Sequence, residues 1–164
     1  MSISANLAWQ ADKIIIDFEL RGDINRLNLA EFTTEKNRII GLWEATCFEL
    51  FIKATNSDEY LEFNFAPSGD WDCFYFTHYR SELTQYTSIS SSDIEISVHQ
   101  RQGQYQQNIK INTAHFPSCL QQAVQSKIGL NAVMKIGGKL SYWGLKHPQH
   151  KPDFHNEEGF VIAW

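Results

Sequence analysis

Two short segments place carboxylates among aromatic residues, a combination that can bind a polar ligand. The stretch LWEATCFELF, residues 42–51, contains Glu49, and the stretch YLEFNF, residues 60–65, contains Glu62 and Asn64. Carboxylate and amide groups hydrogen-bond ligand hydroxyls, while aromatic rings stack on apolar ligand faces. The first question is therefore whether these polar groups are satisfied inside the protein or face a ligand.

The elements that must position these groups are two strands. Residue types predict strands over Thr46–Lys53 and Tyr60–Phe65, and the short polar loop between them predicts an antiparallel hairpin. Alternate side chains of a strand point to opposite faces, so Phe48, Leu50 and Phe63 should enter the core. The other face is then expected to carry Cys47, Glu49, Phe51, Tyr60, Glu62 and Asn64.

Two interpretations of this polar face follow. Like charges on one sheet surface repel and raise each other's pKa unless a cation or solvent compensates them. In the first interpretation, Arg38 or Arg80 spans Glu49 and Glu62 in an ion-pair network. In the second, the face is a ligand groove, and a ring of Trp43, Trp71, Tyr75 or Trp143 stacks on the ligand. Spacing alone favours the ion-pair network.

The rest of the chain predicts an all-β protein, an antiparallel β-sandwich of jelly-roll type formed by one domain over residues 1–164. Short alternating runs separated by turn residues recur along it, whereas helical periodicity is scarce. The one predicted helix is a short connection over Ser118–Lys127, after Pro117 and before Gly129. The remaining predicted strands are Lys13–Arg21, Arg26–Leu29, Trp71–Tyr79, Ile94–Gln100, Tyr105–Asn112, Asn131–Ile136, Lys139–Leu145 and Phe160–Ile162.

Composition narrows the classes of partner. Fourteen Lys and Arg against nineteen Asp and Glu give a formal net charge of -5, with no basic run, so a nucleic-acid partner is not expected. No apolar run approaches the roughly 20 residues of a membrane-spanning helix, and no secretory signal pattern begins the chain. We therefore expect a cytoplasmic protein with no membrane partner. The three cysteines lack CxxC spacing, which disfavours disulfides and structural zinc.

A second cluster of chemically active residues lies near the C-terminus. The stretch HPQHKPDFH contains His147, Asp153 and His155, residue types that bind zinc or iron. Its prolines indicate an extended loop without the helical spacing of a well-defined metal motif, so metal is the weaker reading. No common catalytic motif is present. Glu49 and Glu62 could form a glycosidase pair in principle, but nothing else supports hydrolysis, and an enzyme is not expected.

Several segments together carry a family resemblance. The stretches LWEATCFELF, YLEFNFAPSGDW, FYFTHYR, SYWGLKHP and PDFH, in this order over about residues 38–155, resemble a bacterial branch of the DOMON-like domains related to family-9 carbohydrate-binding modules. The resemblance implies a β-sandwich that binds a ligand without catalysis. Relatives in the wider superfamily bind sugars, and some DOMON domains bind haem.

The resemblance also implies roles for individual residues. Trp43 and Glu44 match the Trp-Glu pair that begins the family's central strand, and Glu49 matches the acidic residue within that strand. Glu62 and Asn64 fall in the segment that resembles the family's Tyr-x-Glu-Phe-Asn pattern. The family-9 modules hold a terminal sugar between two tryptophans, a role that Trp43 or Trp71, together with Trp143, would take here.

The sequence therefore predicts a non-catalytic module that binds a small molecule, preferably a carbohydrate or a sugar derivative, without a cofactor. The alternatives are a haem- or metal-binding domain of DOMON type and a protein-interaction domain without a small ligand. The expected ligand-binding residues are Arg38, Trp43, Glu44, Glu49, Tyr60, Glu62, Asn64, Trp71, Tyr75, Arg80, Trp143 and His147.

Overall fold

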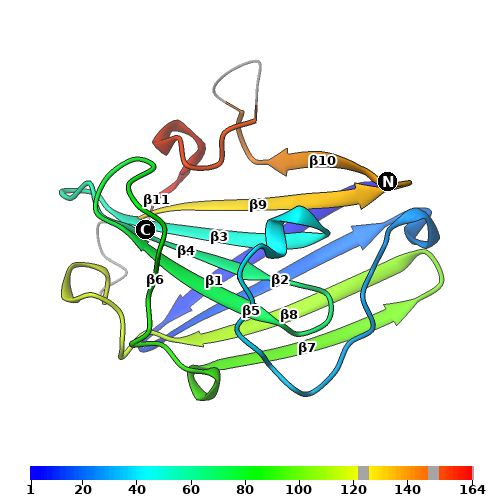
Figure 1. Ribbon diagram of the computed structural model, residues 1–164, viewed down its shortest axis with the longest axis horizontal. Helices are drawn as coiled ribbons and strands as arrows, with labels where there is room; N and C mark the ends of the chain where they lie inside the picture. Colours follow the sequence, from blue (N-terminus) through cyan, green and yellow to red (C-terminus); the bar gives the residue numbers. More distant parts are fainter. Residues whose placement is uncertain (122–125, 148–151, 164) are drawn as a thin grey trace.

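The protein is an all-β sandwich of two antiparallel sheets, as predicted (Figure 1). The structure is a computed structural model that describes residues 1–121, 126–147 and 152–163. The first sheet has the strand order β1-β2-β8-β7, formed by β1 (Ser2–Gln10), β2 (Lys13–Arg21), β8 (Gln104–Asn112) and β7 (Ile94–Arg101). Its strands run obliquely to those of the second sheet (Figure 1).

The second sheet contains the predicted hairpin at its centre. Its strand order is β10-β9-β3-β4-β5-β6, and β11 also pairs with β9. The strands are β10 (Lys139–Gly144), β9 (Ser126–Ile136), β3 (Cys47–Ala54), β4 (Tyr60–Phe65), β5 (Trp71–Phe76), β6 (Thr84–Gln85) and β11 (Ile162–Ala163). The central position of β3 and β4 puts their side chains far from the sheet edges.

The main hydrophobic core lies between the two sheets. Alternate residues of β3 and β4, including Phe48, Leu50 and Phe63, pack there against Ile16, Phe18 and other residues of the first sheet. This is the face that strand alternation predicted to be apolar. Burial of rings and branched side chains on both inner faces provides most of the stabilisation of such a sandwich.

The outer face of the second sheet is also covered, although no third sheet packs on it. Every residue of β3 and β4 is buried. A second apolar cluster forms here from Phe51, Tyr60, Phe74, Phe76 and Phe160, with Trp43 and Phe154 packed against it. The covering segments are the 3-10 turn η2 (Leu42–Glu44) and the chain between residues 152 and 160, which contains the turn η5 (Glu157–Gly159).

Several element predictions need correction. The predicted strand Arg26–Leu29 is the end of a 3-10 turn, η1 (Ile24–Arg26), followed by an isolated bridge from Leu27 to Ile136. The prediction of a helix over Ser118–Lys127 is wrong, because neither end of this segment that the structure describes is an α-helix. It starts as a single turn, η4 (Ser118–Leu120), and Ser126 and Lys127 already belong to β9, while residues 122–125 lie outside the described residues.

The sequence analysis also missed β1 and the two-residue strand β6. Both lie at an edge of a sheet, where side chains are only partly buried. In β1 the residues Ile3, Ala5, Leu7 and Trp9 nevertheless alternate with smaller or polar residues, a strand signal that the sequence analysis overlooked. Within the described part of the chain, no helix has the length and apolar character needed to cross a membrane.

Candidate ligand pocket on the outer face of the second sheet

The two acids share one face of the sheet. Glu49 lies directly opposite Asn64, and Glu62 lies opposite Phe51, so Glu49 and Glu62 are diagonal neighbours on adjacent strands. Diagonal neighbours on such strands are roughly 7–8 Å apart at the backbone, within reach of long side chains. On the other side of β3, Asn131 of β9 lies opposite Glu49 on the same face. The shared face predicted from strand alternation is thus confirmed.

A pocket of about 430 Å³ opens above these acids. Its walls combine aromatic, aliphatic and charged side chains that come from segments far apart in the sequence. Trp43 comes from η2, Tyr142 from β10, and Phe154 from the C-terminal segment. The full lining is Trp43, Glu44, Glu49, Glu62, Arg80, Leu83, Val133, Leu140, Tyr142, Pro152, Phe154 and His155.

The two acids differ in their partners. Asn64 Nδ2 donates to Glu62 Oε1 at 2.7 Å, and His155 Nε2 lies 3.6 Å from Glu62 Oε2. Glu49 is 3% exposed, and among the described residues its carboxylate has neither a hydrogen-bond donor nor an ion-pair partner. A buried carboxylate without a partner is costly. Glu49 is therefore the least satisfied polar group of the pocket.

Burial changes the acid–base properties of both acids. It raises the pKa of Glu49 well above its ordinary value, and the nearby charge of Glu62 raises it further. Burial also raises the pKa of Glu62 to about 7, although the hydrogen bond from Asn64 and the charge of Arg80 act in the opposite direction. Burial therefore disfavours the charged form of both carboxyl groups.

Cys47 lies beside these acids and is chemically quiet. Its Sγ donates to the side-chain oxygen of Asn64 at 3.5 Å, and burial together with the charge of Glu49 raises the pKa of the thiol. A thiol that resists ionisation is a poor nucleophile. Cys47 therefore acts as a buried neighbour that orients Asn64.

One wall of the pocket is a hydrogen-bonded chain around Tyr60. The backbone N–H of Arg80 donates to the Tyr60 hydroxyl at 3.2 Å, and this hydroxyl lies 2.8 Å from His155 Nδ1. Because the hydroxyl already accepts one bond, its own proton can be donated to Nδ1, which favours the tautomer with a proton on Nε2, facing Glu62. Burial lowers the pKa of His155 to about 4, so the imidazole is neutral.

Arg80 lies at the rim of the pocket and not at its floor. Its Nη2 lies 2.8 Å from Asp153 Oδ1, and Asp153 also accepts from the Tyr79 hydroxyl at 2.6 Å. Arg80 therefore reaches Glu62 only through its longer-range charge. Glu62 and Glu49 keep no direct cationic partner in the described part of the chain, so the ion-pair interpretation of the sequence is wrong.

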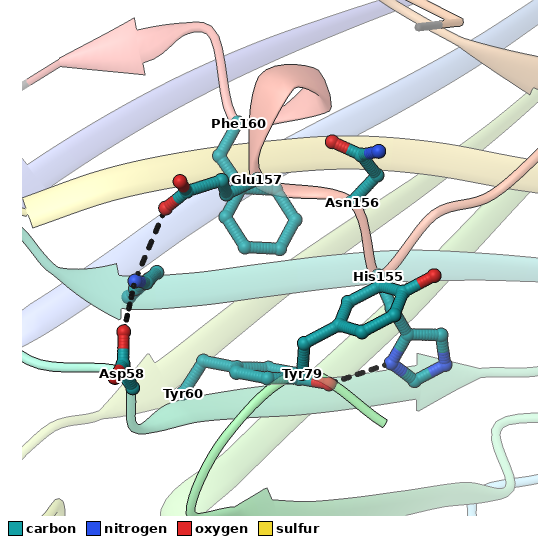
Figure 2. A pocket seen from close by; sticks show the side chains of 8 residues that line it. Asp58, Tyr60, Tyr79, His155, Asn156, Glu157 and Phe160 are labelled. Carbon is teal, nitrogen blue, oxygen red and sulfur yellow. Dashed lines mark hydrogen bonds and ion pairs between the residues drawn. The ribbon is translucent and has the colours of Figure 1, made fainter. Parts of the chain in front are cut away.

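A second pocket shares His155 with the first and also contains Tyr60 (Figure 2). It has a volume of about 410 Å³ and is lined by Lys53, Asp58, Tyr60, Tyr79, His155, Asn156, Glu157 and Phe160. Lys53 Nζ lies 3.1 Å from Glu157 Oε2 and 3.5 Å from Asp58 Oδ1. The charged side chains of this second pocket are thus paired with each other, whereas Glu49 in the first pocket has no such partner among the described residues.

Arg38 was predicted to bind the ligand or the two acids, and the structure places it elsewhere. Its guanidinium donates to Asp72 Oδ1 at 2.7 Å and to the backbone carbonyls of Tyr86 and Ile89 at 3.1 and 2.9 Å. It also lies over the ring of Trp71, 4.7 Å from the ring centroid. Arg38 therefore joins the loop before β3 to β5 and the segment after β6.

Three of the aromatic residues predicted to bind the ligand do not line this pocket. Trp71 is 0% exposed in the core, opposite Phe65, so it cannot reach a ligand. Tyr75 and Trp143 point toward the same inner side of the sheet and pack against the main core. Strand alternation requires that either Tyr142 or Trp143 face the pocket, and the residue that does so is Tyr142.

The remaining site predictions fall in or near the pocket. Trp43 and Glu44 line it. Tyr60 is buried and lines the second pocket, and the exposed His147 stacks on Phe154 at a centroid distance of 6.1 Å. Whether these residues contact a ligand stays a prediction.

Sequence reasoning missed Phe154, Val133 and Asn131 as parts of this face. The register of β9 against β3 brings the last two there, and no motif signals that register. Gly144 provides the one local signal, because a Cβ at this position would lie 2.6 Å from the side-chain oxygen of Asn131. A residue without a side chain is needed beside that amide.

The metal candidates do not converge in the described residues, which contain no group of three or more His, Cys, Asp or Glu arranged to hold a metal ion. Asp153 holds Arg80 and Tyr79, while His155 contacts Tyr60 and Glu62. His147 stacks on Phe154 instead. His150 of the same stretch lies outside the described residues.

Comparison with solved structures defines the fold. A candidate carbohydrate-binding protein from Bacteroides uniformis superposes with a TM-score of 0.68 at 13% identity, over 96% of this chain and 75% of that one. The chain shares the β-sandwich fold of the family-9 carbohydrate-binding modules. A module of this family from Caldicellulosiruptor kristjanssonii, in complex with cellotriose, superposes with a TM-score of 0.55 at 9% identity, over 92% and 69% of the two chains.

A family-9 module from Caldicellulosiruptor kristjanssonii in complex with glucose superposes with a TM-score of 0.51 at 10% identity, over 92% of this chain and 70% of that one. No protein-family model and no curated protein sequence matches the chain. At these identities the likeness concerns the fold, and the DOMON-like part of the resemblance stays a prediction.

Proposed function

We propose that the protein binds a carbohydrate or sugar derivative, without catalysis, in the pocket above Glu49 and Glu62. The observation that carries the proposal is the pocket itself, in which buried polar acceptors form the floor and the rings of Trp43, Tyr142 and Phe154 form the walls. Sugars present hydroxyls at their edges and apolar C–H faces, and this combination of walls and floor suits both. Two solved proteins of the same fold are complexes with cellotriose and glucose, which supports this class of ligand.

The arrangement of the acids supports binding rather than hydrolysis. Glycoside hydrolysis needs two carboxyl groups on either side of the bond that is cleaved. Glu49 and Glu62 instead project side by side from neighbouring strands of the pocket floor. They would touch the same side of a bound sugar.

A haem-binding role receives no support from the placement of the methionines. Met134 is 1% exposed and packs in the core between the sheets, facing away from the pocket. Met1 lies beside Gly22 at the other sheet. A Met–His pair of axial ligands on the outer face therefore cannot be built from these residues.

The first test is a titration with D-glucose and cellotriose, in which binding is measured by calorimetry and by tryptophan fluorescence. Trp43 is the tryptophan that lines the pocket, so a bound sugar is expected to change its emission. Trp43→Ala and Tyr142→Ala should each weaken binding about tenfold or more, because each removes a stacking wall. Trp143→Phe is the matched control, since Trp143 faces the opposite side of the sheet, and it should leave the affinity unchanged.

Two results would contradict the proposal. If the wild-type protein binds none of a panel of neutral, amino and acetylated sugars, its ligand is not a carbohydrate. If sugar binding persists in Trp43→Ala and Tyr142→Ala but is lost in Trp143→Phe, the ligand occupies another face of the molecule.

A further inference from the structure

The charge of the pocket is not balanced by the protein. Two buried carboxyl groups form its floor, and Glu44 adds a third at the rim. The cationic side chain in the described part of the lining is Arg80, whose guanidinium is held by Asp153 at 2.8 Å. His155 accepts a hydrogen bond at Nδ1 from Tyr60 and is neutral. A ligand that enters this pocket therefore meets two acids whose charged forms have no direct cationic partner among the described residues, and a cationic ligand would favour those charged forms.

Glu49 is the second, independent indication of a ligand. Its side chain lines the pocket, the residue is only 3% exposed, and its carboxylate lacks a hydrogen-bond donor among the described residues. Buried polar groups in folded proteins are almost always hydrogen-bonded, so a group without a partner inside a pocket indicates where a ligand donor would bind. Glu62 Oε2 is similarly available, because His155 Nε2 lies 3.6 Å away, beyond hydrogen-bond distance.

An ammonium group matches this arrangement better than a hydroxyl. It has three N–H donors and a positive charge, so it can bond both carboxylates at once and neutralise part of their charge. A hydroxyl donates a single proton and leaves the charge uncompensated. The aromatic walls add to the preference, since an ammonium group is attracted to the face of an indole or phenol ring such as those of Trp43 and Tyr142.

We propose that the ligand carries a protonated amino group that binds between Glu49 and Glu62, so that the pocket selects an amino sugar over the neutral sugar of the same shape. The sugar part of this inference rests on the proposed function. The amino part rests on the two acids alone. An N-acetylated sugar should be rejected, because acetylation removes both the charge and two of the three donors.

The test compares four probes at pH 7 and matched ionic strength by calorimetry: D-glucosamine, D-glucose, N-acetyl-D-glucosamine and cyclohexylammonium. D-Glucosamine is expected to bind roughly ten- to a hundredfold more tightly than D-glucose, the range that a hydrogen-bonded charge provides. Glu49→Gln and Glu62→Gln should each reduce this preference about tenfold. Glu95→Gln, an exposed acid on β7 in the other sheet, is the matched control and should keep it.

The outcomes separate the two proposals. Equal affinity for D-glucose and D-glucosamine overturns the amino inference while leaving carbohydrate binding in place. Tight binding of cyclohexylammonium, equal to that of D-glucosamine, supports the amino inference and overturns the carbohydrate proposal. A glucosamine preference that survives both Glu→Gln substitutions also overturns the amino inference. The folded state of each variant is checked by its thermal unfolding before the titration.

Discussion

Replacing Arg38 with Met is expected to destabilise the protein by about 3–5 kcal/mol, the cost of removing one partner of a buried ion pair. Asp72 is 0% exposed and accepts from Arg38 Nη2 at 2.7 Å. Without the guanidinium, Asp72 keeps donors from Gln85 and from the backbone N–H of Cys73, but no cation. The carbonyls of Tyr86 and Ile89 lose their donor as well.

Urea denaturation at pH 7 measures this effect as a lower midpoint with an unchanged slope. Arg80→Met is the matched control, because the Arg80 side chain is 53% exposed, and it should cost at most about 1 kcal/mol. Adding Asp72→Asn to Arg38→Met should restore part of the loss, since the buried charge is then gone. If Arg38→Met instead keeps full stability and loses ligand binding, Arg38 belongs to the binding site and its structural assignment is wrong.

The second large effect is a loss of stability as the pH rises from 6.5 to 8. Glu62 has a pKa of about 7 in the folded protein, whereas an unfolded glutamate titrates near 4.5. The folded state holds more protons than the unfolded state from about pH 4.5 to just above pH 7, so the free energy of unfolding falls with rising pH, by roughly 3 kcal/mol in total for Glu62. Roughly 1 kcal/mol of this loss occurs between pH 6.5 and 8. Glu49, whose pKa burial raises further, contributes with the same sign.

The pH range of this measurement must exclude the titration of His155, which changes stability in the opposite direction. Burial, together with the charge of Arg80, lowers the pKa of His155 to about 4, so His155 makes stability rise with pH between about 4 and 6.5. The other charged groups that act on Glu62 are Arg80 and Asp72. Above pH 6.5 the slope therefore reports the two glutamates.

Urea unfolding at pH 6.5, 7, 7.5 and 8 tests this expectation. The double variant Glu49→Gln/Glu62→Gln should remove the slope and should be more stable than the wild-type protein at pH 8, because neutral amides replace two charges that burial disfavours. A wild-type stability that stays flat or increases over this range would show that the acids are compensated in the folded protein. The same substitutions are expected to weaken ligand binding, so stability and function would oppose each other at this site.

The sequence predicted those parts of the site that depend only on the alternation of side chains along a strand. Strand alternation alone places Glu49, Glu62 and Asn64 on one face, and the polar loop between the strands predicts their pairing. The same alternation showed that either Tyr142 or Trp143 must face away from the pocket. It could not decide which, because that depends on how β10 pairs with β9.

The failures concern residues whose positions depend on long-range packing. Trp71 begins a strand after a glycine-containing turn, which resembles an exposed position, yet it pairs with Phe65 and lies in the core. Arg38 was predicted to pair with Glu49 and Glu62, although another acid, Asp72, holds it instead. Neither outcome can be read from spacing, because both are set by the packing of the loop before β3 against β5 and the segment after β6.

The pairing of β3 with β9 has a consequence for the way the protein matures. The two acids belong to the first half of the chain, but Asn131, Val133, Tyr142 and Phe154 belong to its last third. Contacts between such distant segments form slowly, because a long loop must close before they provide any stabilisation. During synthesis the acids therefore leave the ribosome well before Tyr142 and Phe154, and the pocket is complete only after Phe154 has been made.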